Sequence, residues 1–296
     1  MSKIIDKEVI CKSRSDVFEF HPIGDCHIGA RNCAETRLRR RIKAIETNPN
    51  AYAILGGDVT DAIKPQDMKR FDVNCLADWI IEGDADSTRE KLGDILHQQF
   101  ERAAEIFEPI KDRILGAIEG NHEHAIFKYH NQNIHRALCQ RLGIPDLTDE
   151  AFIRLRFKRC SAVVVVKMYI RHGYGGGRTP GTEPNKLDRM LAEWEDADIC
   201  FTGHTHTADV LPPKPKLYVP NTGKLPKEFL CRYRWAANWG CWLYSHSSGA
   251  STYASRACYP ARPMISCKAE IRPFKEKRLG QYKYANPEIE IRTIPL

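Results

Sequence analysis

Short apolar runs alternate with segments of helical spacing over the first two thirds of the chain. Strands are predicted over residues 17–23, 51–55, 113–118, 163–170 and 198–201, where apolar and β-branched residues gather. Helices are predicted over residues 35–47, 89–110, 124–142 and 185–195, where apolar positions recur every three or four residues. Such alternation is typical of an α/β fold, in which ligands bind beyond the carboxyl ends of the strands.

The last third of the chain has a different pattern. After residue 206, Pro and Gly become frequent and the apolar residues favour strands, with Ile289, Ile291 and Ile294 near strict alternation. The sequence has no internal repeat and no low-complexity tract. We therefore expect a β-rich C-terminal part over residues 207–296.

Composition and charge exclude several classes of protein. The chain has 296 residues, of which 42% are hydrophobic and 28% charged, as in globular proteins and unlike disordered or collagenous chains. Its longest apolar run, residues 162–166, is far below the roughly 20 residues that span a bilayer. The N-terminus lacks the apolar stretch of a signal peptide, and the 11 cysteines form no C-x-x-C pair, which predicts free thiols in the cytoplasm. The net charge of +7 permits a polyanionic substrate without requiring one.

Five of the predicted strands lead into a turn in which Asp, Asn or His stands near glycine. The turns are Asp25-Cys26-His27, Gly57-Asp58-Val59-Thr60-Asp61, Gly120-Asn121-His122-Glu123, His172-Gly173 and Gly203-His204-Thr205-His206. Each motif alone is common and carries little information. All five occur in one chain at strand ends, so we expect their side chains to converge on one site.

The residue types in these turns indicate a metal site. Asp-x-His and His-x-His place two ligands two positions apart, so that in an extended segment both point the same way. Mixed ligation by His, Asp and Asn suits Mn²⁺, Fe or Zn²⁺ and argues against Ca²⁺ or an iron–sulfur cluster.

The set of motifs from Asp25 to His206 resembles the calcineurin-like metallophosphoesterase superfamily, with its D-x-H, G-D-x-x-D, G-N-H-E, H-G and G-H-x-H blocks. The resemblance implies an α/β (α+β) fold in four layers: a two-sheet β-sandwich flanked by helices, with a dinuclear metal site at the strand ends. It implies one domain over residues 1–296, with helical insertions near 63–108 and 125–158.

The resemblance also implies a role for each motif residue. One divalent ion would be held by Asp25, His27 and His206, with Asp58 bridging to the second. The second ion would be held, together with Asp58, by Asn121, His172 and His204. We expect Mn²⁺, with Fe, Zn²⁺ or Ni²⁺ as alternatives, and a bridging water that attacks phosphorus as hydroxide. His122 would protonate the leaving group, and Asp61 would orient its ring.

Two differences in sequence from the protein phosphatases restrict the class of substrate. Those enzymes grip a phosphomonoester with arginines at the positions where this chain has Ala62 and His124-Ala125. We therefore expect a phosphodiesterase acting on nucleic acid, a nuclease. The alternative is a phosphodiesterase or phosphatase of a small cyclic, dinucleotide or capped nucleotide. A non-catalytic metal-binding scaffold is disfavoured, because His122 is present without being a ligand.

The loop after His172 offers a candidate phosphate contact. Gly175, Gly176 and Arg178 are expected to bind substrate there, although a plain flexible loop is the alternative. Residues 173–185 resemble phage metallophosphoesterases termed DNA-repair exonucleases, with a core like that of SbcD-type nucleases. This implies the cytoplasm of a bacterial host. About 90 residues follow His206, too few for the DNA-binding cap of those nucleases.

Several charged clusters bear on nucleic-acid binding. Basic residues crowd the segments 37–43 and 154–159; the second fits a strand with a basic face as well as a phosphate track. Arginines and aromatics mix between Arg232 and Trp239, as in single-strand platforms or in an ordinary core. The acidic residues Glu82, Asp84 and Asp86 would repel a nucleic acid if they faced the site. The sequence leaves partner proteins and oligomeric state open.

Overall fold

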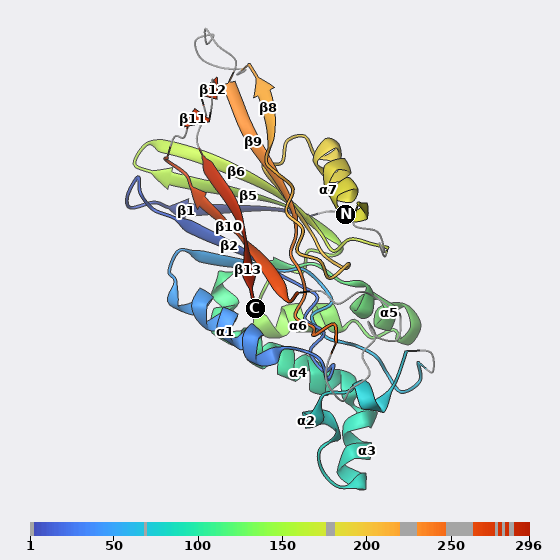
Figure 1. Ribbon diagram of the computed structural model, residues 1–296. Coiled ribbons are helices and arrows are strands. Elements are labelled where there is room, and N and C mark those ends of the chain that lie inside the picture. Colours follow the sequence, from blue (N-terminus) through green and yellow to red (C-terminus); the bar gives the residue numbers. More distant parts are fainter. Residues whose placement is uncertain are drawn as a thin grey trace.

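Two β-sheets lie face to face in the centre of the protein, as the computed structural model in Figure 1 shows. The structure describes residues 3–67, 70–175, 181–219, 230–246, 263–275, 278–279, 282–283 and 287–296. The two sheets bring together strands from both ends of the chain.

The larger sheet has six strands in the order β1-β5-β6-β7-β9-β8. Their bounds are β1 Lys3–Ile10, β5 Glu150–Arg159, β6 Ala162–Arg171, β7 Ile199–Thr202, β8 Lys214–Tyr218 and β9 Leu230–Asn238. Strands β6, β7 and β9 run parallel. The motifs after β6 and β7 therefore emerge at the same edge.

The smaller sheet has five strands in the order β13-β10-β2-β3-β4. Their bounds are β2 Phe18–Ile23, β3 Ala51–Leu55, β4 Ile114–Ala117, β10 Ile265–Arg272 and β13 Glu288–Pro295. Strands β2, β3 and β4 are parallel neighbours, so three further motifs share one edge. A separate pair consists of β11 Arg278–Leu279 and β12 Tyr282–Lys283.

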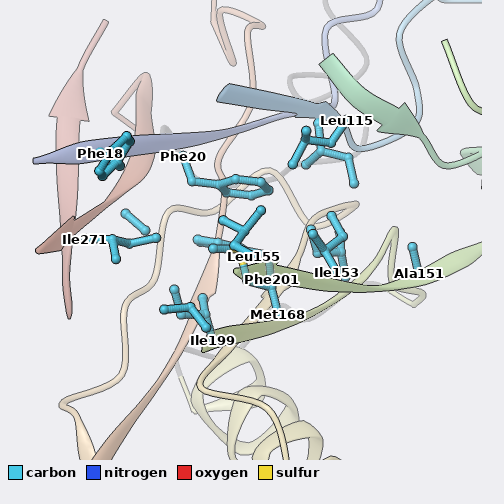
Figure 2. Close-up of a cluster of buried hydrophobic side chains, with 14 of the residues drawn as sticks. Phe18, Phe20, Leu115, Ala151, Ile153, Leu155, Met168, Ile199, Phe201 and Ile271 are labelled. Atoms are coloured by element: carbon cyan, nitrogen blue, oxygen red, sulfur yellow. The ribbon is translucent and has the colours of Figure 1, made fainter. Parts of the chain in front are cut away.

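The main hydrophobic core fills the space between the sheets. Figure 2 shows Phe18 and Phe20 of the smaller sheet facing Leu155 and Phe201 of the larger one, and all four are at most 3% exposed. Along β5, buried positions alternate with exposed or half-buried ones, as expected for a strand with one face on a core.

Helices cover both outer faces of the sandwich (Figure 1). Helices α1 Glu35–Thr47, α4 Ile95–Phe107 and α6 Ile134–Leu142 share a second core with β2 and β3, while α7 Thr182–Glu193 packs on β7 and β9. The remaining helices are α2 Asp78–Ile81, α3 Ala85–Gly93, α5 Asn121–His130 and the 3₁₀ segments Val73–Cys75 and Glu108–Arg113. The four-layer sandwich expected from the sequence is confirmed.

Two of the predicted helices are each broken in two. The helix expected over 89–110 divides into α3 and α4 at Asp94, whose φ of −118° is not helical. The helix expected over 124–142 divides into α5 and α6, because Asn131 adopts a left-handed conformation and the Asn133 side chain caps α6. Periodicity alone did not show these breaks.

The sequence suggested a helical insertion over residues 125–158. The structure is helical in only part of this segment. Its last part belongs to β5, a strand between β1 and β6, and its basic residues are paired: Arg154 and Arg156 form ion pairs with Asp6. The basic face of a strand, rather than a phosphate track, explains this cluster. Strand β1 itself was not predicted.

Two further expectations can be compared with the described residues. There, no helix is long and apolar enough to cross a bilayer. The cysteines in these ranges are free thiols.

Candidate dinuclear metal centre

The five motif-bearing turns meet at one edge of the sandwich. Asp25 follows β2, Asp58 follows β3 and Asn121 begins α5 just beyond β4, while His172 and His204 follow β6 and β7 of the other sheet. The parallel strands of the two sheets thus place all their polar ends together. The convergence predicted from the sequence is present.

The backbone of these turns is strained at the polar residues themselves. Five of the seven predicted ligands have positive φ: Asp25 at 50°, His27 at 48°, Asp58 at 48°, His204 at 70° and His206 at 57°. Such conformations are uncommon outside glycine and concentrate at functional sites. Conventional turns would aim these side chains elsewhere.

A first group of ligand atoms comes from Asp25, His27 and His206, and these atoms lie within 4.8 Å of one another. The Nε2 atoms of His27 and His206 are 3.3 Å apart, and His206 Nε2 is 3.3 Å from Asp25 Oδ1. His27 Nδ1 lies 3.3 Å from the Asp61 carboxylate, which leaves Nε2 as the inward nitrogen.

A second group comes from Asp58, His172 and His204, again within 4.8 Å. The Asn121 Oδ1 atom joins it, 3.1 Å from His172 Nε2 and 2.7 Å from His204 Nδ1. His172 Nδ1 donates to the carbonyl of Gly56 at 2.8 Å, so Nε2 is the ring nitrogen that faces the group.

Asp58 lies between the two groups. Its Oδ2 is 3.2 Å from His172 Nε2 and 3.9 Å from His27 Nε2, while its Oδ1 accepts the backbone N–H of His122 at 2.9 Å. One oxygen is thus held by the backbone and the other faces both groups. This geometry suits a carboxylate shared by two cations.

His122 lies at the first group, with its ring 4.6 Å from that of His27. Its Nδ1 is 2.5 Å from the backbone carbonyl of Asp61, so Nε2 is the nitrogen left for a substrate. Asp61, expected to orient His122, contacts its ring through the backbone carbonyl, while the Asp61 carboxylate contacts His27. His122 Nε2 also belongs to a region that could hold a cation, since His27, Asp58 and His122 form a further group.

Opposite charges in this buried region shift each other's pKa. Burial lowers the pKa of His172, but the adjacent Asp58 carboxylate outweighs this effect and raises it to about 10. For Asp58, burial opposes ionisation, yet the neighbouring imidazoles hold its pKa well below the usual range. Burial likewise opposes protonation of His122, and the carboxylates of Asp58 and Asp61 raise its pKa overall.

The donor set fits divalent cations. Asp25 Oδ1 is fully buried and accepts no hydrogen bond from any described residue, which is costly unless a cation supplies the missing partner. Two imidazole nitrogens face each other across 3.3 Å, where at most one can donate. Carboxylate and amide oxygens mixed with imidazole are ligands of Mn²⁺, Fe and Zn²⁺.

Two residues that the sequence analysis did not assign to the site hold its ligand-bearing turns in place. The buried Glu123 carboxylate accepts the backbone N–H groups of Asp58 and of neighbouring residues. Trp239 is 1% exposed and donates its indole N–H to Asp25 Oδ2 at 2.7 Å. Trp239 is therefore a core residue and not part of a single-strand platform, whereas Tyr233 and Trp235 of the same segment are half-buried.

The predicted substrate loop is only partly described. Gly175 is exposed, has a φ of 69° and accepts a hydrogen bond from Lys186 Nζ at 3.1 Å. Gly176 and Arg178 lie outside the described residues. Their contact with substrate stays a prediction.

Comparison with known proteins identifies the family. The family of calcineurin-like phosphoesterases matches residues 21–208. Among solved structures, the chain is similar to a predicted phosphoesterase from Streptococcus pneumoniae TIGR4 (13% identity, 86% of this chain and 83% of that one, TM-score 0.31). It is also similar to vacuolar protein sorting 29 from Cryptosporidium parvum (14%, 95% and 99%, 0.37) and to the NAD nucleotidase of Haemophilus influenzae (11%, 95% and 50%, 0.36).

No curated protein matches the chain. The solved structures share too little geometry, with TM-scores below 0.5, to bear on its substrate. The family match, in contrast, spans more than half of the chain and contains all five turns. The protein therefore belongs to the calcineurin-like phosphoesterases and is a metal-binding hydrolase of phosphoester bonds.

Proposed function

We propose that this protein hydrolyses phosphodiester bonds of nucleic acid, with two divalent cations, preferably Mn²⁺, in the metal centre. The observation that carries the proposal is a basic and aromatic surface along helix α5, which begins at Asn121 of the metal centre; it is formed by Lys64, Phe127, Lys128 and Tyr129. We call it the α5 surface.

Helical geometry connects the α5 surface to the centre. Lys128 and Tyr129 follow Asn121 and His122 by seven residues, which places each on the same helix face two turns on. Seven residues rise about 10 Å, roughly the length of three nucleotides at the helical rise of DNA. A strand leaving the centre past His122 would meet these side chains.

The side chains of the α5 surface are available for binding. Phe127 is 44% exposed and Tyr129 69%, and Lys128 Nζ lies 5.2 Å from the centre of the Tyr129 ring. Lys64 reaches the far end of α5, where its Nζ is 3.4 Å from Gln132 Oε1. Exposed rings stack on bases and lysines bind phosphates, the combination found in proteins that bind single strands.

The centre itself is open to a long substrate. Asn121 is exposed, and His122, His204 and His206 are half-exposed. Ala62, at a position where protein phosphatases carry arginine, is fully buried and cannot bind a phosphomonoester. A diester within a polymer suits this geometry.

The contacts support the following roles. Asp25, His27 and His206 would hold one cation, and Asn121, His172 and His204 would hold the other, with Asp58 between the two groups. Cations held there would neutralise phosphate charge and lower the pKa of water. His122, with one proton on Nδ1 fixed by the Asp61 carbonyl, carries a second on Nε2 and transfers it to the leaving oxygen. The strand beyond that oxygen runs over the α5 surface.

The experiment compares two diesters. Purified protein with Mn²⁺ is offered a labelled single-stranded oligonucleotide and bis-p-nitrophenyl phosphate, each at a series of salt concentrations. The variant Lys128→Ala is paired with the control Lys7→Ala. Lys7 also lies over a tyrosine ring, that of Tyr52 at 6.0 Å, but at the amino end of β3, away from Asp58.

We expect oligonucleotide cleavage that weakens steeply with salt. Lys128→Ala raises KM for the oligonucleotide and reduces the logarithmic salt slope by about 1, because one phosphate contact is lost. Its turnover of the small diester and both activities of Lys7→Ala stay unchanged. Turnover of bis-p-nitrophenyl phosphate with intact oligonucleotides would contradict the proposal and favour the small-nucleotide alternative.

A further inference from the structure

We infer that Trp239 is a positioning residue of the metal centre, which determines which oxygen of Asp25 is presented to a cation. The inference rests on the metal centre proposed above. Trp239 follows β9 directly and lies between the two sheets beneath the ligand-bearing turns.

Three of those turns rest on the Trp239 indole. A Cβ atom on Gly24 would lie 2.7 Å from the ring, one on Gly56 2.6 Å and one on Gly203 2.1 Å. These glycines precede Asp25, the Gly57-Asp58 turn and His204, and they come from both sheets. Only the missing side chain of glycine lets each backbone approach the ring so closely. One rigid ring thus fixes the positions, relative to one another, of three turns that are far apart in the sequence.

The indole N–H acts on one oxygen of Asp25. Oδ2 accepts two hydrogen bonds, from Trp239 Nε1 at 2.7 Å and from the backbone N–H of His204 at 2.9 Å. Oδ1 is buried without a donor among the described residues and lies 3.3 Å from His206 Nε2. Because Oδ2 is saturated, the carboxylate cannot rotate without breaking both bonds, and Oδ1 remains the oxygen for a cation.

Trp239 is itself firmly held. Its backbone N–H donates to Thr202 at 3.0 Å. The preceding Asn238 donates from Nδ2 to Thr205 Oγ1 at 2.8 Å and to the Gly203 carbonyl at 3.3 Å. The same two residues therefore fix the Asp25 carboxylate and the turn that carries His204 and His206.

The test is Trp239→Phe, which retains a ring in the core but removes the N–H. The matched control is Trp242→Phe: Trp242 is also 1% exposed and lies three residues away, but its side chain packs in the core beside α1. Its backbone N–H donates to the Asp25 carbonyl at 3.0 Å, a bond that the substitution retains. Mn²⁺ affinity is measured by electron paramagnetic resonance of the free ion, and the melting temperature of each protein is measured in chelator.

We expect Trp239→Phe to lose roughly 10- to 100-fold in affinity for one Mn²⁺, the range for partners that orient a metal ligand. Trp242→Phe lowers the melting temperature comparably but binds Mn²⁺ as the unaltered protein does. Equal affinity in Trp239→Phe and the unaltered protein, or an equal loss in Trp242→Phe, overturns the inference. An unaltered protein that binds no Mn²⁺ overturns the metal centre itself.

A second measurement needs no stable variant of Trp239. The chain has five tryptophans, whose indole N–H resonances are resolved in a nitrogen–proton correlation spectrum and assigned by changing the other four. Addition of diamagnetic Zn²⁺ should shift the Trp239 resonance more than that of Trp242. A Trp239 resonance that does not move while Zn²⁺ binds overturns the inference.

Discussion

Glu123→Gln tests whether the Glu123 carboxylate holds the Asp58 turn in place; we call this set of hydrogen bonds the Glu123 clamp. The Glu123 side chain is 4% exposed and accepts four backbone N–H groups: those of Val59 and Thr60 on Oε1, at 2.7 and 3.1 Å, and those of Asp58 and Gly120 on Oε2, at 2.9 and 3.2 Å. The bond from Gly120 also closes the first turn of α5.

Glutamine has the same shape but only one acceptor oxygen. Whichever way the amide is turned, two buried backbone donors face its NH₂ group. Each donor left without an acceptor costs about 1–3 kcal/mol, or about 2–6 kcal/mol for the pair. An opposing effect exists, because burial and the charge of Asp58 raise the pKa of Glu123, and a neutral side chain relieves that repulsion. We therefore expect a net loss near the lower end, about 2–4 kcal/mol.

The melting temperature should fall by roughly 4–16 °C, since 1 kcal/mol corresponds to about 2–4 °C in proteins of this order of size. The loss should be larger with Mn²⁺ than with chelator, because a cation at Asp58 removes the repulsion that favours the neutral side chain. Differential scanning fluorimetry under both conditions measures it. Glu119→Gln is the control: Glu119 is half-buried and its carboxylate contacts the exposed His124. A Glu123→Gln protein as stable as Glu119→Gln would refute the clamp.

Three further outcomes follow from the structure. His122→Ala should lose about 10²- to 10⁴-fold in oligonucleotide cleavage but much less with bis-p-nitrophenyl phosphate, whose leaving group needs no proton; equal losses would exclude proton donation. Gly203→Ala places a methyl group against the Trp239 indole, which should lower the free energy of unfolding by about 1–3 kcal/mol and weaken Mn²⁺ binding. Gly93→Ala, whose methyl group meets open space, should change neither quantity in thermal and binding assays. The hydrogen bond with His21 lowers the pKa of Glu19 from 4.5 to about 2, so the contribution of Glu19 to stability is present above pH 4.5 and is lost towards pH 2. Glu19→Gln should therefore reduce the dependence of the unfolding free energy on pH between pH 4.5 and 2. Urea unfolding at a series of pH values measures this dependence.

The sequence predicted those features of the site that depend on local pattern. Strands ended close to where apolar runs ended, and each polar turn followed its strand, because strand and turn propensities act over a few residues. The breaks at Asp94 and Asn131 were missed for a related reason. Both lie inside segments whose apolar spacing continues across the break, so the backbone conformation at one residue decides them.

What the sequence did not show depends on distant contacts. Trp239 and Asp25 are separated by 214 residues. Nothing in the segment around Trp239 distinguishes a metal-supporting tryptophan from an ordinary core residue. The sequence also did not show that Asp61 contacts His122 through its backbone carbonyl, while its carboxylate contacts His27. One signal was available for Trp239: three glycines directly before polar turns indicate a bulky neighbour against which the backbone packs.

The strain in the ligand turns and the supports beneath them have one explanation. Positive φ at five ligands costs of order 1–3 kcal/mol each and persists only where the surroundings enforce it. Contacts within the protein enforce it: Glu123 holds the Asp58 turn, and the Trp239 indole and the His204 backbone N–H hold Asp25. In both carboxylates one oxygen accepts protein N–H groups and the other faces the imidazoles. The protein's own contacts thus orient the ligand atoms, so less of the free energy of metal binding is needed to order the site.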